Sequence, residues 1–258
     1  MPLLLLLQAH SNSSRRLIFS FSVGLCFFIT PLVRCPFALD LVPARKAPPH
    51  IVELPQHGEA SPTSTVTLCG GGHRMPIVGF GTGGRTDRHK RYQSVIAALA
   101  AGIRHIDTAQ VYKDEDVVAQ AISDSGVRRE EVFVTTKLST FSDRSFTFNS
   151  ALDSLRGSLQ RLKMSYVDCF LIHSPLDRSN RLEIWRALLH ARDQLGLARS
   201  VGVSNYGIAH LKEIQANGLE LPAVNQLEIH PWFTNDEVVS YCHANGITVM
   251  HSGHEPMP

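Results

Sequence analysis

Residues 104–137 read RHIDTAQVYKDEDVVAQAISDSGVRREEVFVTTK, and this stretch decides the fold. It holds two apolar strands that end in ionisable residues, Asp107 and Lys137, with one helix-sized amphipathic segment between them. A third strand, FLIH at 170–173, ends in the same way at His173. Because the carboxyl ends of parallel strands open onto one face, we expect a carboxylate, an ammonium and an imidazole around a single mouth.

The spacing of these strands predicts their connections. The strand endings lie 30 residues apart (107 to 137) and then 36 (137 to 173), and similar strands follow at 200–203, 223–226 and 246–249. Apolar periodicity predicts helices over 87–101, 115–124, 148–162, 180–195 and 209–216. Alternating strands and helices predict an α/β fold with a parallel sheet, either an eightfold barrel or an open doubly wound sheet.

A glycine pattern makes the open sheet one possible interpretation. Gly79, Gly81 and Gly84 satisfy G-x-G-x-x-G directly after the apolar strand 77–80, and Asp107 ends the next strand, where a ribose-binding carboxylate would lie. Asp107 follows Gly79 by 28 residues, whereas a Rossmann fingerprint places its acid about 20 residues on. On spacing alone, the glycine pattern is explained equally well by a dinucleotide-binding loop and by a plain tight turn.

The composition of the chain limits the classes of function that it can have. The chain has 258 residues, 43% of them apolar, and a net charge of +2, which fits one α/β core and argues against a nucleic-acid surface. Its five cysteines form no C-x-x-C pair, so neither a disulfide framework nor a metal site is indicated.

The N-terminal part differs from the rest. No acidic residue precedes Asp40, and Arg15–Arg16 stand before an uncharged apolar run over 17–33. Residues 1–40 are thus typical of a leader, whether a secretory signal, a transit peptide or a short anchor. We expect secretory, organellar or membrane localisation, or a cytoplasmic one if the leader is not functional. Proline-rich residues 41–64 predict a linker, and residues 65–258 a folded domain that begins with a glycine-turn β-hairpin over 66–78, able to plug a barrel.

Several motifs in one order resemble the aldo-keto reductases. Residues 102–109 (GIRHIDTA), followed by Tyr112, resemble that family's signature, and LIH at 171–173, VGVSNY at 201–206 and VNQLEIHP at 224–231 resemble its later motifs. The resemblance runs from about residue 66 to 249. It implies a (β/α)8 barrel of the TIM type that binds NADPH (NADP) in extended form without a Rossmann domain, with Gly79–Gly84 as the first strand and its turn.

The resemblance also implies a reaction, the reduction of aldehydes or ketones to alcohols with NADPH. Tyr112 matches the general acid. A phenol with a pKa of ~10 is a poor donor near neutral pH, but an ammonium beside it stabilises the phenolate and lowers that pKa. Lys137 matches this ammonium, Asp107 would hold it in place, and His173 would orient the carbonyl and stabilise charge on its oxygen.

The cofactor contacts implied by the resemblance come from several strand ends. Ser204, Asn205 and Gln226 match the residues that bind the nicotinamide carboxamide and fix which ring face meets the substrate. The full predicted set is Gly81, Thr82, Asp107, Ser204, Asn205 and Gln226.

The sequence departs from the family pattern in two places. Gly83 and Ser174 stand where many members have tryptophan, which would open the pocket and leaves the substrate class open. After Val249 the chain reads MHSGHEPMP, where the family continues with a stacking tyrosine and a strand that grips the 2′-phosphate. The domain has 194 residues (258 minus 64) against about 250 for a typical barrel, so we expect about seven strands, with the last strand and the C-terminal helices missing.

An incomplete barrel would expose two strand edges, through which copies could associate. Two alternatives to the reductase therefore stay open: a catalytically inactive regulatory or partner-binding subunit, and a Rossmann-type NAD(P) dehydrogenase. We expect the reductase to bind a small carbonyl substrate. We expect no nucleic-acid partner, and contact with a membrane only through the leader.

Overall fold

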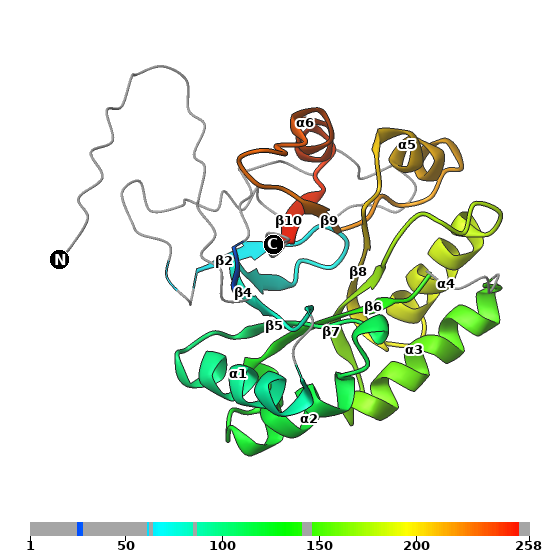
Figure 1. The fold of residues 1–258 in the computed structure, drawn as a ribbon. Coiled ribbons are helices and arrows are strands. Elements are labelled where there is room, and N and C mark those ends of the chain that lie inside the picture. Colours follow the sequence, from blue (N-terminus) through cyan, green and yellow to red (C-terminus); the bar gives the residue numbers. More distant parts are fainter. Residues whose placement is uncertain (1–24, 28–60, 62–63, 85–86, 141–145, 253–258) are drawn as a thin grey trace, which may run out of the picture.

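Within the described residues, seven parallel strands, each hydrogen-bonded to the next in sequence, form most of an eight-stranded sheet (Figure 1). The computed structural model describes residues 25–27, 61, 64–84, 87–140 and 146–252. The strands are β4 (Val78–Gly81), β5 (His105–Asp107), β6 (Phe133–Leu138), β7 (Val167–Ile172), β8 (Ala198–Ser204), β9 (Val224–Glu228) and β10 (Thr248–Ser252). This sequential strand order is that of a barrel. In a doubly wound sheet, the order of the strands reverses at a switch point. The predicted barrel with seven strands is confirmed, and the Rossmann alternative is wrong.

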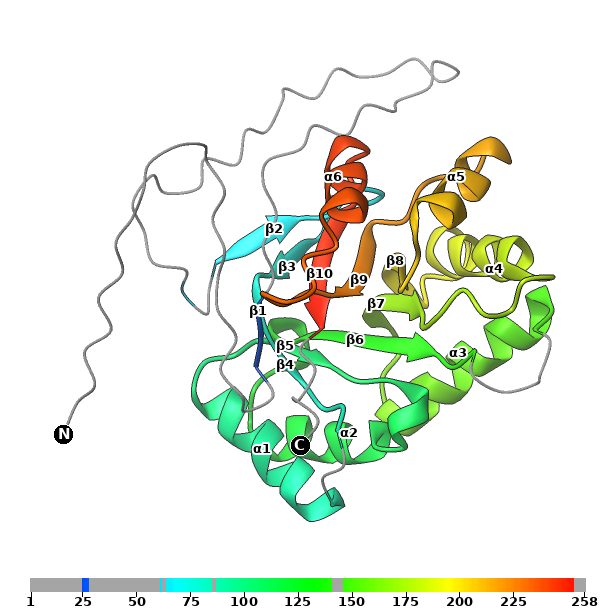
Figure 2. The same cartoon turned by 45° about the horizontal axis from the view of Figure 1, so that its top comes forward.

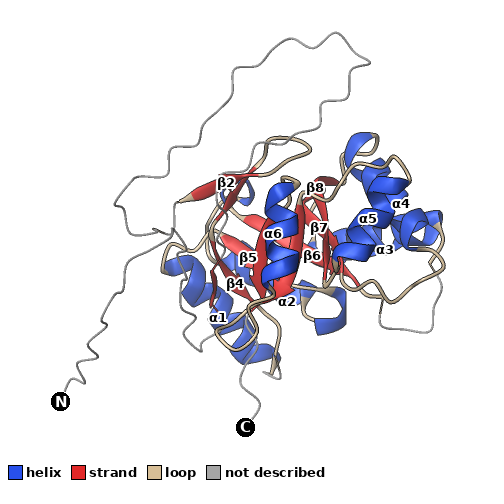
Figure 3. Ribbon diagram, turned by 90° about the horizontal axis from the view of Figure 1, so that it is seen from above, coloured by secondary structure: helices blue, strands red, loops and turns tan. Residues whose placement is uncertain are grey.

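Helices connect these strands and surround them, as the view from above shows (Figure 3). They are α1 (Arg88–Ala100), α2 (Glu115–Asp124), α3 (Phe148–Leu162), α4 (Arg181–Asp193), α5 (Ile208–Ala216) and α6 (Asp236–Ala244), with single turns η1 (Gln110–Tyr112) and η2 (Arg129–Glu131). Capping fixes the starts of two of them: Asp87 accepts from the Lys90 amide and Thr147 from the Ser150 amide. The first five match the predicted helices, whereas α6 has no predicted counterpart.

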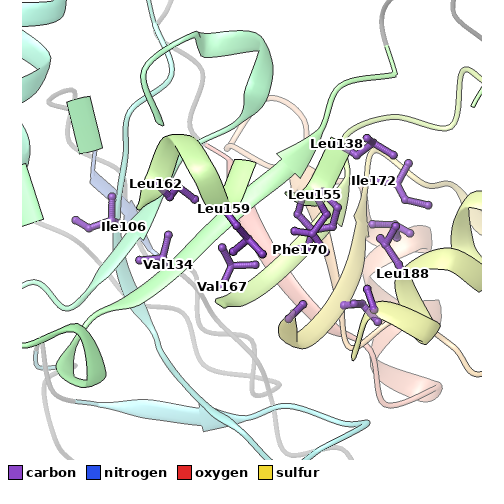
Figure 4. Packing of buried hydrophobic residues seen from close by; sticks show 14 of the residues in the cluster. Ile106, Val134, Leu138, Leu155, Leu159, Leu162, Val167, Phe170, Ile172 and Leu188 are labelled. Atoms are coloured by element: carbon purple, nitrogen blue, oxygen red, sulfur yellow. The ribbon is translucent and has the colours of Figure 1, made fainter. Parts of the chain in front are cut away.

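The core lies between the outer face of the sheet and these helices (Figure 4). In α3, Leu155, Leu159 and Leu162 follow helical spacing and are buried in the cluster that holds Val167 and Phe170 of β7. Each fully buried leucine of this kind contributes roughly 1.5–3 kcal/mol relative to an exposed one. This packing fixes the strands whose ends carry the site.

A hairpin covers the N-terminal end of the barrel strands (Figure 2). Strands β2 (Thr65–Thr67) and β3 (Arg74–Pro76) pair antiparallel around the turn Gly70–Gly72, whose glycines all have positive φ. Leu68 and Met75 are buried in one cluster with residues of the barrel strands, namely Phe133, Cys169, Leu171, Ala223, Val224 and Met250. The predicted hairpin and its role as a plug are therefore confirmed.

A short strand from the N-terminal part also joins the sheet. Strand β1 (Leu25–Phe27) pairs antiparallel with β4, with Leu25 opposite Phe80, and it contacts β10 as well. The edge of β4, expected to be bare, thus has a partner. Apart from β1 and residues 61 and 64, the predicted leader (1–40) and linker (41–64) lie outside the described residues. Within the described ranges, no helix is long and apolar enough to cross a membrane.

Gly202 in β8 is a position where the sheet leaves no room for a side chain. A Cβ there would lie 2.5 Å from the Val224 carbonyl oxygen and 2.8 Å from Leu171 Cδ2. We expect Gly202→Ala to lower the free energy of unfolding by about 1–3 kcal/mol. Gly157→Ala is the matched control, because a Cβ there meets only the end of the Arg161 side chain, at 3.2 Å. This control should stabilise the helix by about 0.5–1 kcal/mol. Urea denaturation measures both, and equal effects would contradict the packing described.

His105 makes the stability of the fold depend on pH. The residue is fully buried, its Nε2 lies 2.9 Å from Thr135 Oγ1, and burial lowers its pKa from 6.5 to about 4. Since the unfolded chain binds the proton more readily, this contribution is complete above pH 6.5 and is lost as the pH falls toward 4. Between pH 7.5 and 5 we expect His105 alone to account for a loss of about 2 kcal/mol. In urea titrations, His105→Gln should flatten the pH dependence by that amount; an unchanged slope would show that His105 is not the cause.

Candidate active site

The carboxyl ends of β5, β6 and β7 bring three ionisable side chains together. Asp107 is the last residue of β5, Lys137 is the penultimate residue of β6, and His173 directly follows β7. The register places Asp107 opposite Thr135 and Lys137 opposite Leu171, so the three residues lie at the same end of the sheet. The single mouth expected from the sequence is therefore present.

Asp107 and Lys137 form a buried ion pair. Lys137 Nζ donates to Asp107 Oδ1 and, at 2.9 Å, to the Thr108 carbonyl oxygen. The Lys137 side chain is 0% exposed and that of Asp107 is 7% exposed. The second carboxylate oxygen of Asp107 accepts from Gln226 Nε2 at 2.9 Å. A buried charge of this kind is tolerated only when it is paired and hydrogen-bonded, as both members are here.

Tyr112 lies above this pair on the turn η1, which follows β5. Lys137 Nζ is 5.2 Å from the centroid of the Tyr112 ring. The His173 ring meets the Tyr112 ring edge to face, with centroids 5.8 Å apart and planes at 85°. The structure thus brings together all four residues that the sequence singles out for chemistry, Asp107, Tyr112, Lys137 and His173. Their catalytic roles stay a prediction.

The electrostatics of the mouth favour a neutral imidazole. Burial, followed by the neighbouring Lys137 ammonium, lowers the pKa of His173 from 6.5 to about 3. At neutral pH the His173 ring is therefore uncharged. It can donate a hydrogen bond to an oxygen in the mouth, but it does not compete with Lys137 as a cation.

The predicted cofactor residues lie around the same mouth. Gly81 ends β4 opposite Asp107, and the Thr82 amide donates to the Asp107 carbonyl oxygen at 2.8 Å. Ser204 ends β8, and Gln226, in β9, pairs with it. Asn205 follows with a positive φ of 62° and donates through Nδ2 to the His173 carbonyl oxygen and to Ser204 Oγ, each at 3.1 Å.

This arrangement fits a nicotinamide carboxamide. The amide nitrogens of Asn205 and Gln226 are engaged as donors within the protein. The described contacts use both N–H donors of Asn205 and one of the two of Gln226, so both residues can offer their amide oxygens to a ligand as acceptors. A carboxamide NH2 group supplies the matching donor, and Ser204 Oγ, whose own proton goes to the Gln226 carbonyl oxygen at 3.1 Å, can accept from the same group.

Comparison with known proteins shows which family the chain belongs to. The model of the aldo/keto reductase family matches residues 76–256. The chain belongs to the aldo/keto reductase family.

Relatives in this family are similar over most of the described domain. An aldo-keto reductase of Mycolicibacterium vanbaalenii is 44% identical over 174 residues, which cover 67% of this chain and 61% of that protein. The aldehyde reductase YPR1 of Saccharomyces cerevisiae is 38% identical over 207 residues, covering 69% and 64%. The crystal structure of the Bombyx mori aldo-keto reductase AKR2E4 in complex with NADP superposes with a TM-score of 0.67 at 37% identity, covering 74% and 66%. The chain spans about three fifths of the length of the curated relatives that it matches.

This member of the family has further residues near Tyr112 that the sequence reasoning missed. Arg91 on α1 and Asp114 before α2 form a buried ion pair beneath Tyr112. Arg91 occupies the inward stripe of α1 together with Val95 and Leu99, so a charge at an apolar position of the helical pattern was the available signal. Asp114 gives no such signal, because an acid before a helix usually serves as a cap.

Proposed function

We propose that the protein is an NADP-dependent oxidoreductase that reduces small aldehydes or ketones to alcohols, with Tyr112 as the general acid. One observation carries this proposal: the Lys137 ammonium, held by Asp107, lies 5.2 Å from the Tyr112 ring centroid at a mouth that His173 also borders. The relatives support the same chemistry, since one is an aldehyde reductase and another was crystallised with NADP.

Each residue has a defined part in this reaction. NADPH, when bound, supplies the hydride that adds to the carbonyl carbon, and the carbonyl oxygen then gains negative charge. The Tyr112 hydroxyl transfers its proton to that oxygen, which gives the alcohol and leaves a phenolate. The Lys137 ammonium stabilises this phenolate. The neutral His173 ring donates a hydrogen bond to the same carbonyl oxygen and so orients the substrate.

The burial of the ion pair explains why it suits this task. Asp107 accepts from both Lys137 and Gln226, so the ammonium has a fixed place before the substrate arrives. A preorganised charge in a site from which water is excluded stabilises a developing anion more than a solvated charge does. Gln226 and Asn205 would at the same time hold the carboxamide, which couples the position of the hydride donor to that of the acid.

Assay of the full chain tests this proposal. NADPH oxidation followed at 340 nm with a panel of aldehydes and ketones should show turnover, and fluorescence titration should show binding of NADPH, with NADH as the comparison. Turnover that is absent although NADPH binds to the folded protein would contradict the reductase and favour the inactive, partner-binding alternative. Absence of both binding and turnover would contradict the cofactor assignment as well.

A further inference from the structure

Arg91 is a buried cation that the proposed reaction does not use. Its side chain is 8% exposed, and its Nε lies 3.2 Å from Oδ2 of Asp114, whose side chain is 0% exposed. The two atoms approach closely without the alignment of a hydrogen bond, so the contact between them is mainly one of charge. A buried ion pair is weak evidence for stability, which raises the question of what else this pair does.

The guanidinium of Arg91 connects two loops of the mouth. Its Nη2 donates to the Gly84 carbonyl oxygen at 2.8 Å, in the segment that follows β4. Its Nη1 donates to the carbonyl oxygen of Tyr112 itself, at 3.4 Å. Arg91 therefore fixes the backbone of the proposed acid relative to the segment that carries Gly83 and Gly84.

That segment lies directly against the phenol ring. A Cβ added at Gly83 would lie 3.2 Å from Tyr112 Cζ and 3.3 Å from its hydroxyl oxygen. The backbone at Gly83 is thus in close contact with the reacting end of Tyr112. Any shift of this segment relative to the Tyr112 backbone would move the phenol.

Asp114 links Arg91 to the ammonium side of the site. Asp114 Oδ1 accepts from Thr108 Oγ1 at 2.6 Å, and the carbonyl oxygen of the same Thr108 accepts from Lys137 Nζ at 2.9 Å. Burial raises the pKa of Asp114, whereas the Thr108 hydrogen bond and the Arg91 charge act in the opposite direction. The pair therefore contacts Tyr112 directly, through Arg91, and Lys137 indirectly, through Thr108.

We propose that Arg91 and Asp114 are positioning residues that set the place of the Tyr112 phenol over the Lys137 ammonium. This inference rests on the proposed role of Tyr112 in reduction. Arg91 acts by holding the Gly84 and Tyr112 carbonyl groups together. Asp114 acts on Lys137 through its hydrogen bond with Thr108. Neither residue is among the predicted catalytic or cofactor-binding residues.

Two variants separate positioning from folding. The double variant Arg91→Met/Asp114→Asn removes both charges, leaves no buried charge unpaired, and keeps an amide oxygen to accept from Thr108. Arg91→Lys keeps the charge pair with Asp114 but lacks the planar fork that reaches two carbonyls. The matched control is Arg156→Met/Asp153→Asn, which removes an ion pair whose side chains are 50% and 72% exposed.

The first readout is spectroscopic and needs no turnover. In NMR spectra of the full chain labelled at tyrosine, the Tyr112 ring signals are assigned by their loss in Tyr112→Phe. Both test variants should shift these signals and speed hydrogen exchange of the 112 and 113 amides, whereas the control should leave them unchanged. Unchanged signals in both folded test variants would overturn the proposal, whether or not the protein proves to be a reductase.

The second readout is kinetic. With an aldehyde that the wild type reduces, both test variants should lower kcat by about 10–100-fold with little change in KM for NADPH, because a small displacement of an acid affects the chemical step. A loss confined to KM, or a loss of equal size in the control, would contradict a positioning role.

Discussion

Replacement of Tyr112 by phenylalanine is expected to lower kcat for aldehyde reduction by about 10²–10⁴-fold, the range that general acids contribute. The change removes the hydroxyl that we propose as the proton donor to the developing alkoxide. NADPH affinity should change little, because the phenol is not among the predicted cofactor contacts. Steady-state oxidation of NADPH at 340 nm measures the first effect, and fluorescence titration the second.

The His173 ring defines the control for this experiment. Since burial lowers its pKa to about 3, the His173 ring is uncharged near neutral pH, and its remaining N–H is a much weaker acid than a phenol, so it cannot replace the acid. His173→Gln should therefore reduce activity mainly through substrate orientation, with a smaller loss in kcat than Tyr112→Phe. A Tyr112→Phe protein that keeps wild-type kcat would show that the acid lies elsewhere.

Lys137→Met is expected to have the second large effect, and this effect is on both stability and activity. It leaves the Asp107 carboxylate buried beside Gln226 without its cation, which should cost about 3–5 kcal/mol of the free energy of unfolding. It also removes the charge that stabilises the phenolate, so reduction should fall to background. Urea denaturation and NADPH oxidation measure the two effects.

A double variant distinguishes the two effects. Asp107→Asn/Lys137→Met removes both charges, so most of the lost stability should return, because no charge is left unpaired. Activity should not return, since the phenolate still lacks its ammonium. If activity recovered together with stability, the role of Lys137 would be structural only.

The elements that the sequence predicted are those with strong local signals. Strands such as 132–137 are rich in β-branched residues and end in one charged residue, and α3 has leucines at helical spacing, so both could be placed from the sequence pattern. Helix α6 is short, and its apolar residues, the partly buried Val238, Val239 and Tyr241 with the buried Cys242, span little more than one turn, which gives a weak periodic signal. Strand β1 owes its place to an edge of β4 that is distant in sequence, so no local pattern could predict the pairing.

The site shows the same division. Asp107, Lys137 and His173 could be grouped because each ends a strand, and the direction of parallel strands then brings them to one rim. The position of Tyr112 on the turn after β5 followed only from the family resemblance. The contacts of Arg91 with Gly84 and with Tyr112 depend on how a helix face meets two loops, and such contacts have no one-dimensional signature.

The transfer of a deuteride in a single turnover tests the central claim most directly. The full chain, mixed with NADPH deuterated at the reactive face of C4 and an aldehyde, should yield an alcohol with one deuterium on the former carbonyl carbon. With Tyr112→Phe the same product should form at least about 100-fold more slowly. An alcohol without deuterium, no alcohol from protein that binds NADPH, or equal rates for the two proteins would contradict the account.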